Sequence, residues 1–316
     1  KVIYLYSGKA TLDELSGILK DSQIIYKNTP LRFFAGIIQL EKKLKPGKYV
    51  IRKGMSLKDI LAMLRRNEQE TVRLVIIKFR TPEQFASFIG KRMECDSAAM
   101  LRVLRDPALL KELRIDSNTW MTAVIPNTYE FYWTTPPEQV LRKLWAEQKR
   151  FWTEDRLAKA AAKQLSPQEI YTLASILDEE TNANAEKDTM ASVYLNRLRN
   201  KIPLQADPTV KFALKDFGLR RIYHVHLETT SLYNTYKYPG LPPGPICTPS
   251  IASLEAVLNA PETEYLYFVA RSDFSGRHVF SKTYSEHRQN AKLYQRALNE
   301  QQRIRAEREK ARENNE

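Results

Sequence analysis

The chain has 316 residues, 43% of them hydrophobic and 28% charged, so it can bury a substantial core and has the composition of an ordinary globular protein. It contains no run of about 18 apolar residues, which excludes a membrane-spanning helix within it, and no cysteine–histidine spacing typical of zinc. The net charge of +13 raises the question of an acidic partner. Much of that excess lies in a terminal run of alternating Arg, Lys and Glu without any nucleic-acid-binding motif, so we expect no nucleic-acid partner.

The first 71 residues contain a weak internal repeat. The segments TLDELSGILK (11–20) and SLKDILAMLR (56–65) align without gaps. Thr11 and Ser56 are natural N-caps, and each is followed by an acid and by apolar residues at helical spacing. Each segment also follows a short strand-like run, so we expect a small α+β module over residues 1–71, with a further strand-like run at 70–79 leading out of it.

The remainder of the chain reads as a mixed, helix-rich domain over residues 72–316. Residues 82–165 are predicted to be mostly helical, interrupted by an aromatic loop, AVIPNTYEFYWTTPP. Two helices follow, at about 167–180 and 185–200. Residues 201–250 are rich in Pro, Gly, Tyr and Asn, and long loops of this kind in a compact protein are more often functional than idle. A short helix, a β-hairpin with Gly276 in its turn and a charged C-terminal helix complete an α+β chain.

Three consecutive acids, Asp178, Glu179 and Glu180, end the first of those two helices. At about 100° per residue, Glu180 continues the apolar stripe that includes Leu173 and Leu177, whereas the other two acids point well away from it. A carboxylate on an apolar face is costly unless it is paired or protonated, and burial raises its pKa as a general acid requires. The pattern favours Glu180 as a catalytic acid, with a buried structural acid or a solvent-exposed helix end as alternatives. We expect Asp178 and Glu179 to face solvent.

Five blocks of sequence, in order and over roughly residues 120–290, resemble the YceG-like endolytic murein transglycosylases. They read LASILDEETNANAEKDTMASVYLNRL, LQADPTVKFAL, YNTYKYPGLPPGPICTPS, YLYFVA and HVFSKTYSEH. The upstream IPNTYEFY is similar to a short Pro-Asp-Thr-aromatic motif of that family, with Asn127 in the Asp position. The module at residues 1–71 is similar to the LysM-like part of the same family.

The resemblance implies a bacterial envelope enzyme that cuts nascent peptidoglycan glycan strands internally and needs no cofactor or metal. It implies a catalytic part on the extracytoplasmic side of the inner membrane, near the glycan-synthesis machinery. A single N-terminal membrane anchor is expected upstream of Lys1, since this chain opens directly on the strand-like KVIYLY without a signal peptide.

The resemblance also assigns the catalytic acid. The family's motif ends in Glu-Lys-Glu-Thr, with the second Glu catalytic, and the matching residues are Asp178, Glu179, Glu180 and Thr181. Glu180 therefore occupies the catalytic position, in agreement with its helical phase. The first Glu and the Lys of the motif are replaced by Asp178 and Glu179, whose negative charges would raise the pKa of Glu180.

Candidate substrate-binding residues lie in the loops that follow, where amide, hydroxyl and aromatic groups suit sugar recognition. They are Gln205, Asp207, Thr209, Asn234 and Tyr236. Asp207 before Pro208 is also typical of a turn or cap, and Tyr236 of simple packing. The stiff loop 240–246 is expected to hold a cleft wall. His278 and His287 either line the cleft or have structural or solvent-facing roles.

The sequence leaves two other functions open. One is a hydrolytic muramidase, in which Asp178 or Asp207 activates water. The other is a non-catalytic scaffold that binds peptidoglycan through the LysM-like module. It also leaves open whether Cys95 and Cys247 ever meet.

Overall fold

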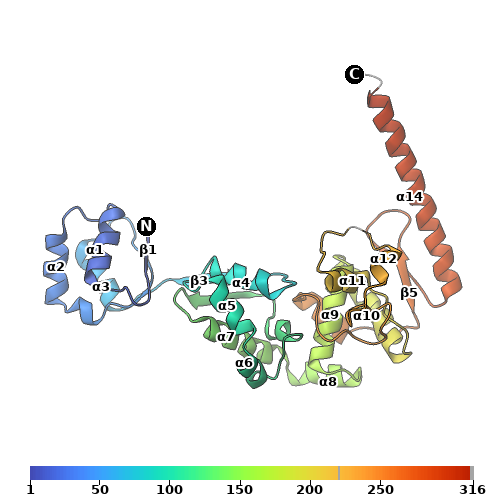
Figure 1. Ribbon diagram of the computed structural model, residues 1–316, viewed down its shortest axis with the longest axis horizontal. Helices are drawn as coiled ribbons and strands as arrows, with labels where there is room; N and C mark the ends of the chain where they lie inside the picture. The colour runs from blue at the N-terminus through green and yellow to red at the C-terminus, as the bar shows by residue number, and fades with distance from the viewer. Residues whose placement is uncertain (220, 314–316) are drawn as a thin grey trace. The chain divides into compact units, whose positions relative to one another are not determined.

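The computed structural model describes residues 1–219 and 221–313 (Figure 1). It is an α+β fold in which helices predominate, as predicted, and it has three antiparallel sheets of two strands each within the described residues. Contacts divide the chain into two compact units. The first is Lys1–Arg114 with Asn127–Ala146, and the second is Ile115–Pro126 with Glu147–Glu316. A domain boundary at residue 71 remains a prediction.

The N-terminal module begins with a strand whose partner comes more than 40 residues later. Its elements in chain order are β1 (Val2–Leu5), α1 (Leu12–Asp21), α2 (Asn28–Ile37), a 3-10 turn (Leu40–Lys42), β2 (Gly47–Val50) and α3 (Leu57–Arg65). β1 pairs with β2 so that Ile3 lies opposite Tyr49. Residues from β1, β2 and all three helices form one hydrophobic cluster between positions 3 and 64. The two strands and three helices of this module therefore share one hydrophobic core.

Both predicted N-caps of this module are confirmed. The Thr11 hydroxyl accepts a hydrogen bond from the Glu14 backbone N–H at 3.2 Å, and Ser56 forms a capping box with Asp59. Helix α2 was not predicted. Its segment NTPLRFFAGI contains Pro30 and Gly36, which lower the expectation of a helix from sequence. Two of its apolar side chains, Phe33 and Ile37, are each 65% exposed.

The middle of the chain pairs a strand after the module with one more than 50 residues on. β3 (Thr71–Val75) runs antiparallel to β4 (Thr128–Tyr132). The helices around them are α4 (Pro82–Gly90), α5 (Ser97–Leu104), α6 (Pro107–Glu112) and α7 (Pro137–Phe151), with a 3-10 turn at Trp120–Ala123. The prediction of an aromatic loop around β4 was wrong. Tyr129 and Phe131 are buried and alternate with exposed neighbours, but a five-residue strand near prolines is hard to distinguish from a loop.

The second unit is built around helix α9 (Pro167–Glu180), which packs against α8, α10, α11 and α13 (Figure 1). Those helices are α8 (Glu154–Ala162), α10 (Asn184–Arg199), α11 (Asp207–Leu214) and α13 (Ile251–Leu258), with the short α12 (His224–Leu227) nearby in sequence. The predicted hairpin is β5 (Tyr267–Ala270) and β6 (His278–Ser281), with Gly276 at φ +74° in its turn. The charged C-terminal helix is α14 (Tyr284–Glu313).

The proline-rich loop before α13 is fixed to the centre of this unit. The Ile246 backbone N–H donates to the Ser175 hydroxyl on α9 at 3.0 Å. Gly244 is buried, and a Cβ there would lie 2.2 Å from the Asn118 carbonyl oxygen, so only glycine fits. The loop is therefore held in place, as its composition suggests.

Two further findings concern disulfide bonds and membrane-spanning helices. Neither Cys95 nor Cys247 forms a disulfide. Among the helices in the described part of the chain, none combines the length and the apolarity that crossing a membrane requires.

Candidate active site

Helix α9 carries the predicted catalytic acid, Glu180, on its last turn. The capped start of the helix determines on which side of it Glu180 lies. Ser166 and Glu169 form a reciprocal capping box, in which the Ser166 backbone N–H donates to Glu169 Oε2 at 2.8 Å. Pro167 occupies the first helical position. The helix ends at Glu180 because Thr181 is extended, at φ −143°. With its start and end defined, the helix presents Glu180 at its C-terminal end, where the chain turns away.

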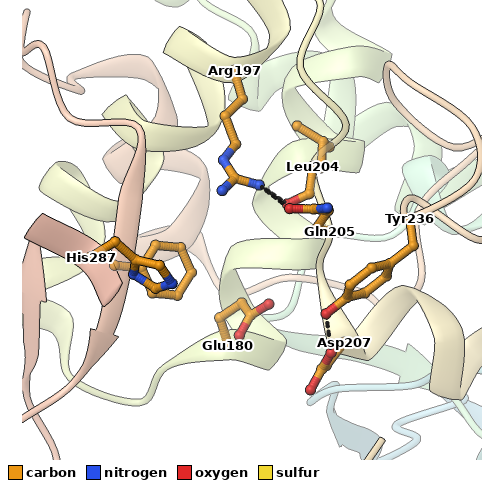
Figure 2. A pocket seen from close by; sticks show the side chains of 8 residues that line it. Glu180, Arg197, Leu204, Gln205, Asp207, Tyr236 and His287 are labelled. Atoms are coloured by element: carbon orange, nitrogen blue, oxygen red, sulfur yellow. Dashed lines mark hydrogen bonds between the residues drawn. The ribbon is translucent and has the colours of Figure 1, made fainter. Parts of the chain in front are cut away.

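A cavity of about 280 Å³ opens beside Glu180 (Figure 2). It is lined by residues from α9, α10, the 204–207 segment, the 236 loop, the β5–β6 hairpin and the start of α14. They are Glu180, Arg197, Leu204, Gln205, Asp207, Tyr236, Phe268 and His287. Three of the five predicted substrate-binding residues, Gln205, Asp207 and Tyr236, are therefore in one pocket with the predicted acid. Their roles in binding remain predictions.

The Glu180 carboxyl group is partly buried and has one defined hydrogen-bond partner. The Tyr194 hydroxyl of α10 donates to Glu180 Oε1 at 2.9 Å. Burial raises the pKa of Glu180 to about 7, the Tyr194 hydrogen bond opposes this rise, and the charge of Asp207 adds to it. A carboxyl group with this pKa can hold a proton and release it near neutral pH, as a general acid and base must.

The pocket wall opposite this acid contains a buried cation. Arg197 of α10 is 8% exposed, and its guanidinium donates to the backbone carbonyls of Leu266 (2.7 Å) and Leu204 (3.0 Å). It also donates to Gln205 Oε1 at 3.2 Å. Gln205 has a left-handed backbone, at φ 53°, which a residue other than glycine seldom adopts without support. The Thr235 carbonyl, which accepts from the Gln205 N–H at 3.1 Å, and Arg197 together supply that support.

A second acid faces the pocket from the start of α11. Asp207 Oδ1 accepts a hydrogen bond from the Tyr236 hydroxyl at 2.6 Å (Figure 2). Burial, followed by this contact, raises the pKa of Tyr236. The sequence left open a turn or cap role for Asp207 and a packing role for Tyr236. Asp207 is the first residue of α11 and Tyr236 is partly buried, and both also line the cavity.

The other two predicted substrate-binding residues lie away from the cavity. Thr209 and Asn234 are fully buried. The Thr209 hydroxyl donates to the Ala206 carbonyl at 2.7 Å, while the Asn234 amide donates to the Leu227 and Thr229 carbonyls at 2.9 and 2.8 Å. Their polar atoms thus satisfy backbone groups in the loops that carry Gln205, Asp207 and Tyr236. We now expect them to shape those loops rather than to contact substrate.

The expectation that Asp178 faces solvent was wrong. Its side chain is 7% exposed and forms a buried ion pair with Lys187 of α10 at 3.2 Å, and it accepts from the hydroxyls of Ser250 (2.6 Å) and Ser253 at the start of α13. A helical wheel assumes that a helix has one buried side. Helix α9 is surrounded by neighbours, so its polar face is buried too, and Asp178 joins three helices there.

The other substituted acid acts on Glu180 directly. The negative charge of Glu179 contributes to the raised pKa of Glu180, after burial and Asp207. Glu179 is partly exposed, unlike Asp178. The predicted effect of like charges is therefore present, and it comes from Glu179.

One of the two histidines left open from the sequence lines the cavity. His287 stacks on Tyr267, with ring centroids 5.3 Å apart, and its pKa is lowered by burial and by the nearby Arg197. His278 lies outside the cavity lining, where its Nδ1 is 3.5 Å from a carboxylate oxygen of Glu186.

Sequence reasoning missed Tyr194, Arg197 and Phe268. Tyr194 and Arg197 are one turn apart in the buried part of α10. The buried residues around them include Ser192 and Asn196, so no apolar stripe distinguishes Tyr194 or Arg197 in the sequence. Phe268 carries no distinguishing signal either. Among residues 1–219 and 221–313, no group of three or more histidine, cysteine or carboxylate side chains is arranged to hold a metal ion.

Comparison with known proteins bears on this geometry. The profile of the YceG-like family matches residues 6–293, which is most of the chain. The chain belongs to the YceG-like family. A 2.6 Å crystal structure of a YceG-like protein from Listeria monocytogenes has a TM-score of 0.61 and 26% identity to this YceG-like protein, covering 92% of it and 98% of the other chain.

Curated relatives share its sequence over long stretches. An endolytic murein transglycosylase of Bacillus subtilis is 28% identical over an alignment of 306 residues, and the match covers 92% of this chain and 84% of that protein. Endolytic murein transglycosylases of two Streptococcus pneumoniae strains are each 27% identical over an alignment of 277 residues, and each match covers 78% of this chain. This YceG-like protein spans 50% of the length of each streptococcal relative.

Proposed function

We propose that this protein is a peptidoglycan lytic transglycosylase. It cuts nascent glycan strands internally, at the β-1,4 bond between N-acetylmuramic acid and N-acetylglucosamine, and leaves a 1,6-anhydromuramoyl end. The observation that carries the proposal is Glu180, in a polar pocket, with a pKa raised to about 7. Family membership and the names of the curated relatives support the same substrate class.

Glu180 acts first as the general acid. Its carboxyl proton goes to the glycosidic oxygen as the bond to C1 breaks, and the leaving sugar departs as an alcohol. The muramoyl ring then has the oxocarbenium character common to glycoside cleavage. Glu180, now a carboxylate, takes the proton of the muramoyl 6-hydroxyl while that oxygen bonds to C1. The acid is regenerated, no water is consumed, and one carboxyl group suffices because the nucleophile belongs to the substrate.

The surrounding side chains make this cycle possible. Burial keeps Glu180 protonated in a large share of molecules near pH 7, while the Tyr194 hydroxyl orients one of its oxygens. Asp207 is close enough to influence the Glu180 pKa and can stabilise the positive charge that develops on the ring. Gln205, supported by Arg197, and Tyr236 offer polar contacts to the sugar from the opposite wall.

The products decide the question. Purified protein is incubated with nascent glycan, and the released fragments are identified by mass spectrometry for wild type and for Glu180→Gln. We expect anhydromuramoyl ends from wild type and at least about 1,000-fold less release from the variant, because the amide cannot transfer the proton. Undiminished release by folded Glu180→Gln would remove this residue from the mechanism.

One observation supports a second candidate, a hydrolytic muramidase. Asp207 is a second carboxylate beside Glu180 in the same pocket, and pairs of carboxylates are the usual equipment of glycoside hydrolysis. Activation of water by Asp178 has no such support, because the Asp178 side chain is buried in an ion pair with Lys187. Reducing muramic acid ends in the same mass spectra, lost in Asp207→Asn, would indicate hydrolysis.

We also propose the envelope setting that the family resemblance implies. The catalytic unit acts on the extracytoplasmic side of the inner membrane, is held there by an N-terminal anchor outside this chain, and works beside the glycan-synthesis machinery, with a LysM-like module at residues 1–71. Protease added to intact spheroplasts should then degrade the full-length protein. Protection equal to that of a cytoplasmic marker would contradict this location.

A further inference from the structure

The pocket contains a positive charge that the proposed chemistry does not use. Arg197 is only 8% exposed, yet no carboxylate among the described residues pairs with its guanidinium. Its Nε and Nη1 donate only to neutral acceptors, namely three backbone carbonyls and the Gln205 side chain. A buried guanidinium without an anionic partner is expensive, and such charges are usually completed by a counter-charge or a ligand.

One side of this guanidinium is available to a ligand. Nη2 has no hydrogen-bond partner in the described part of the chain, while Nε and Nη1 are fully engaged. Figure 2 shows the guanidinium pointing into the space between Glu180, Gln205 and His287. The engaged nitrogens fix the position of the free one, so a ligand acceptor meets a donor that is already oriented.

We infer that Arg197 recognises the lactyl group of the muramoyl residue and makes the site specific for muramic acid over N-acetylglucosamine. The inference rests on the proposed function. The two sugars of a glycan strand share their 6-hydroxyl and 2-acetamido groups. They differ at position 3, where N-acetylglucosamine has a hydroxyl and the muramoyl residue has a lactyl ether. That substituent ends in a carboxylate, or in an amide carbonyl when a peptide is attached. A guanidinium bonds either oxygen, and bonds the carboxylate more strongly.

The chemistry of the reaction agrees with a contact to a substituent. Positive charge develops at C1 and the ring oxygen during cleavage, so a fixed cation directly at the reacting carbon would slow the reaction. When Arg197 bonds the lactyl oxygen, the positive charge of its guanidinium is compensated by a group outside the reacting ring. Arg197 thereby orients the muramoyl ring, and not its neighbour, with C1 toward Glu180.

The test compares sugars that differ only in the lactyl group. Binding is measured by calorimetry on Glu180→Gln protein, which does not consume its ligands. The ligands are glycan oligomers with free lactyl carboxylates, the same oligomers with lactyl-linked peptide, and N-acetylglucosamine oligomers of equal length. We expect the free acid to bind roughly 10- to 100-fold more tightly than the N-acetylglucosamine oligomer, with the peptide-bearing strand between them.

Variants then assign the preference to Arg197. In Glu180→Gln protein, the additional change Arg197→Lys keeps the positive charge but loses the planar guanidinium donors. It should remove most of the preference for lactyl-bearing ligands. Arg199→Lys is the matched control, since Arg199 is exposed on the same helix and does not line the pocket, and it should keep the preference. Melting temperatures of the variants check folding. The comparison of ligands needs no change at Arg197, so equal affinities overturn the inference even if Arg197→Lys unfolds.

Equal affinity for all three ligands would overturn the inference, as would a preference that survives in folded Arg197→Lys. Equal affinity for the two muramoyl ligands, both above the N-acetylglucosamine oligomer, supports it and assigns the contact to the carbonyl oxygen they share. Cleavage by wild type is measured separately. Glycan cleavage without a lactyl preference contradicts this inference alone, and a preference without cleavage contradicts the proposed activity alone.

Discussion

The Tyr194 hydroxyl donates a hydrogen bond to Glu180 Oε1 at 2.9 Å, from a side chain that is 1% exposed. The hydrogen bond favours the ionised carboxylate, whereas burial favours the neutral acid, and burial has the larger effect. Burial and this hydrogen bond are the two largest of the opposing influences that bring the pKa of Glu180 to about 7, and the hydrogen bond can be removed by itself.

Removing that hydrogen bond should move the pH profile upward. Tyr194→Phe deletes the contribution that lowers the Glu180 pKa, so this pKa rises further. Cleavage requires protonated Glu180 and falls as pH rises through its pKa. The alkaline limb of kcat/KM for glycan release should therefore shift to higher pH, with a loss of about 1 kcal/mol in unfolding free energy. An unchanged limb in a folded variant would show that Tyr194 has only a packing role.

Removing the second acid should move the same limb in the opposite direction. The charge of Asp207 raises the pKa of Glu180, so Asp207→Asn lowers that pKa and shifts the alkaline limb of kcat/KM to lower pH. The position of the limb is the measurement, because the rate also depends on contacts of Asp207 with the sugar. A shift to higher pH would contradict the assigned influence of Asp207.

Glu180 should also make the stability of the protein depend on pH. Its folded pKa, about 7, lies above the ordinary value of 4.5, so the native state holds a proton that the unfolded state releases between these values. Its contribution to stability therefore falls as pH rises from 4.5 to 7. Relative to wild type, Glu180→Gln should gain up to about 3 kcal/mol across this window. Urea unfolding at pH 5 and pH 8 measures the difference, and a constant difference would argue against the raised pKa.

The buried ion pair of Asp178 and Lys187 should be important for folding. Lys187→Met removes the ammonium group that pairs with the buried Asp178 carboxylate, and we expect a loss of about 3–5 kcal/mol in the free energy of unfolding. Urea denaturation measures it. Glu300→Gln is the control, because its pair with Arg303 is exposed and should change stability by less than about 1 kcal/mol. Equal, small effects of both variants would mean that Asp178 finds other partners.

Local signals in the sequence predicted much of the catalytic unit. The capping box at Ser166 and the apolar stripe defined α9 and the phase of Glu180. The turn glycine, Gly276, marked the β5–β6 hairpin. These features depend on residues within a few positions of one another, which a single sequence displays. Helix α2 was missed because Pro30 and Gly36 interrupt its segment, and strand β4 was read as a loop because it depends on a distant partner strand.

The sequence by itself determined the family, the helix that carries Glu180 and the side of that helix on which it lies, because capping and periodicity are local. Only the tertiary structure decided which partners surround it. Arg197 and His287 come to one cavity with Glu180 from elements separated by up to about a hundred residues, and the Tyr194 hydroxyl donates to Glu180 from α10. Asp178 is buried because α9 has neighbours on several sides. Burial and the charges of those partners set the pKa of Glu180, and both arise only when distant segments pack together.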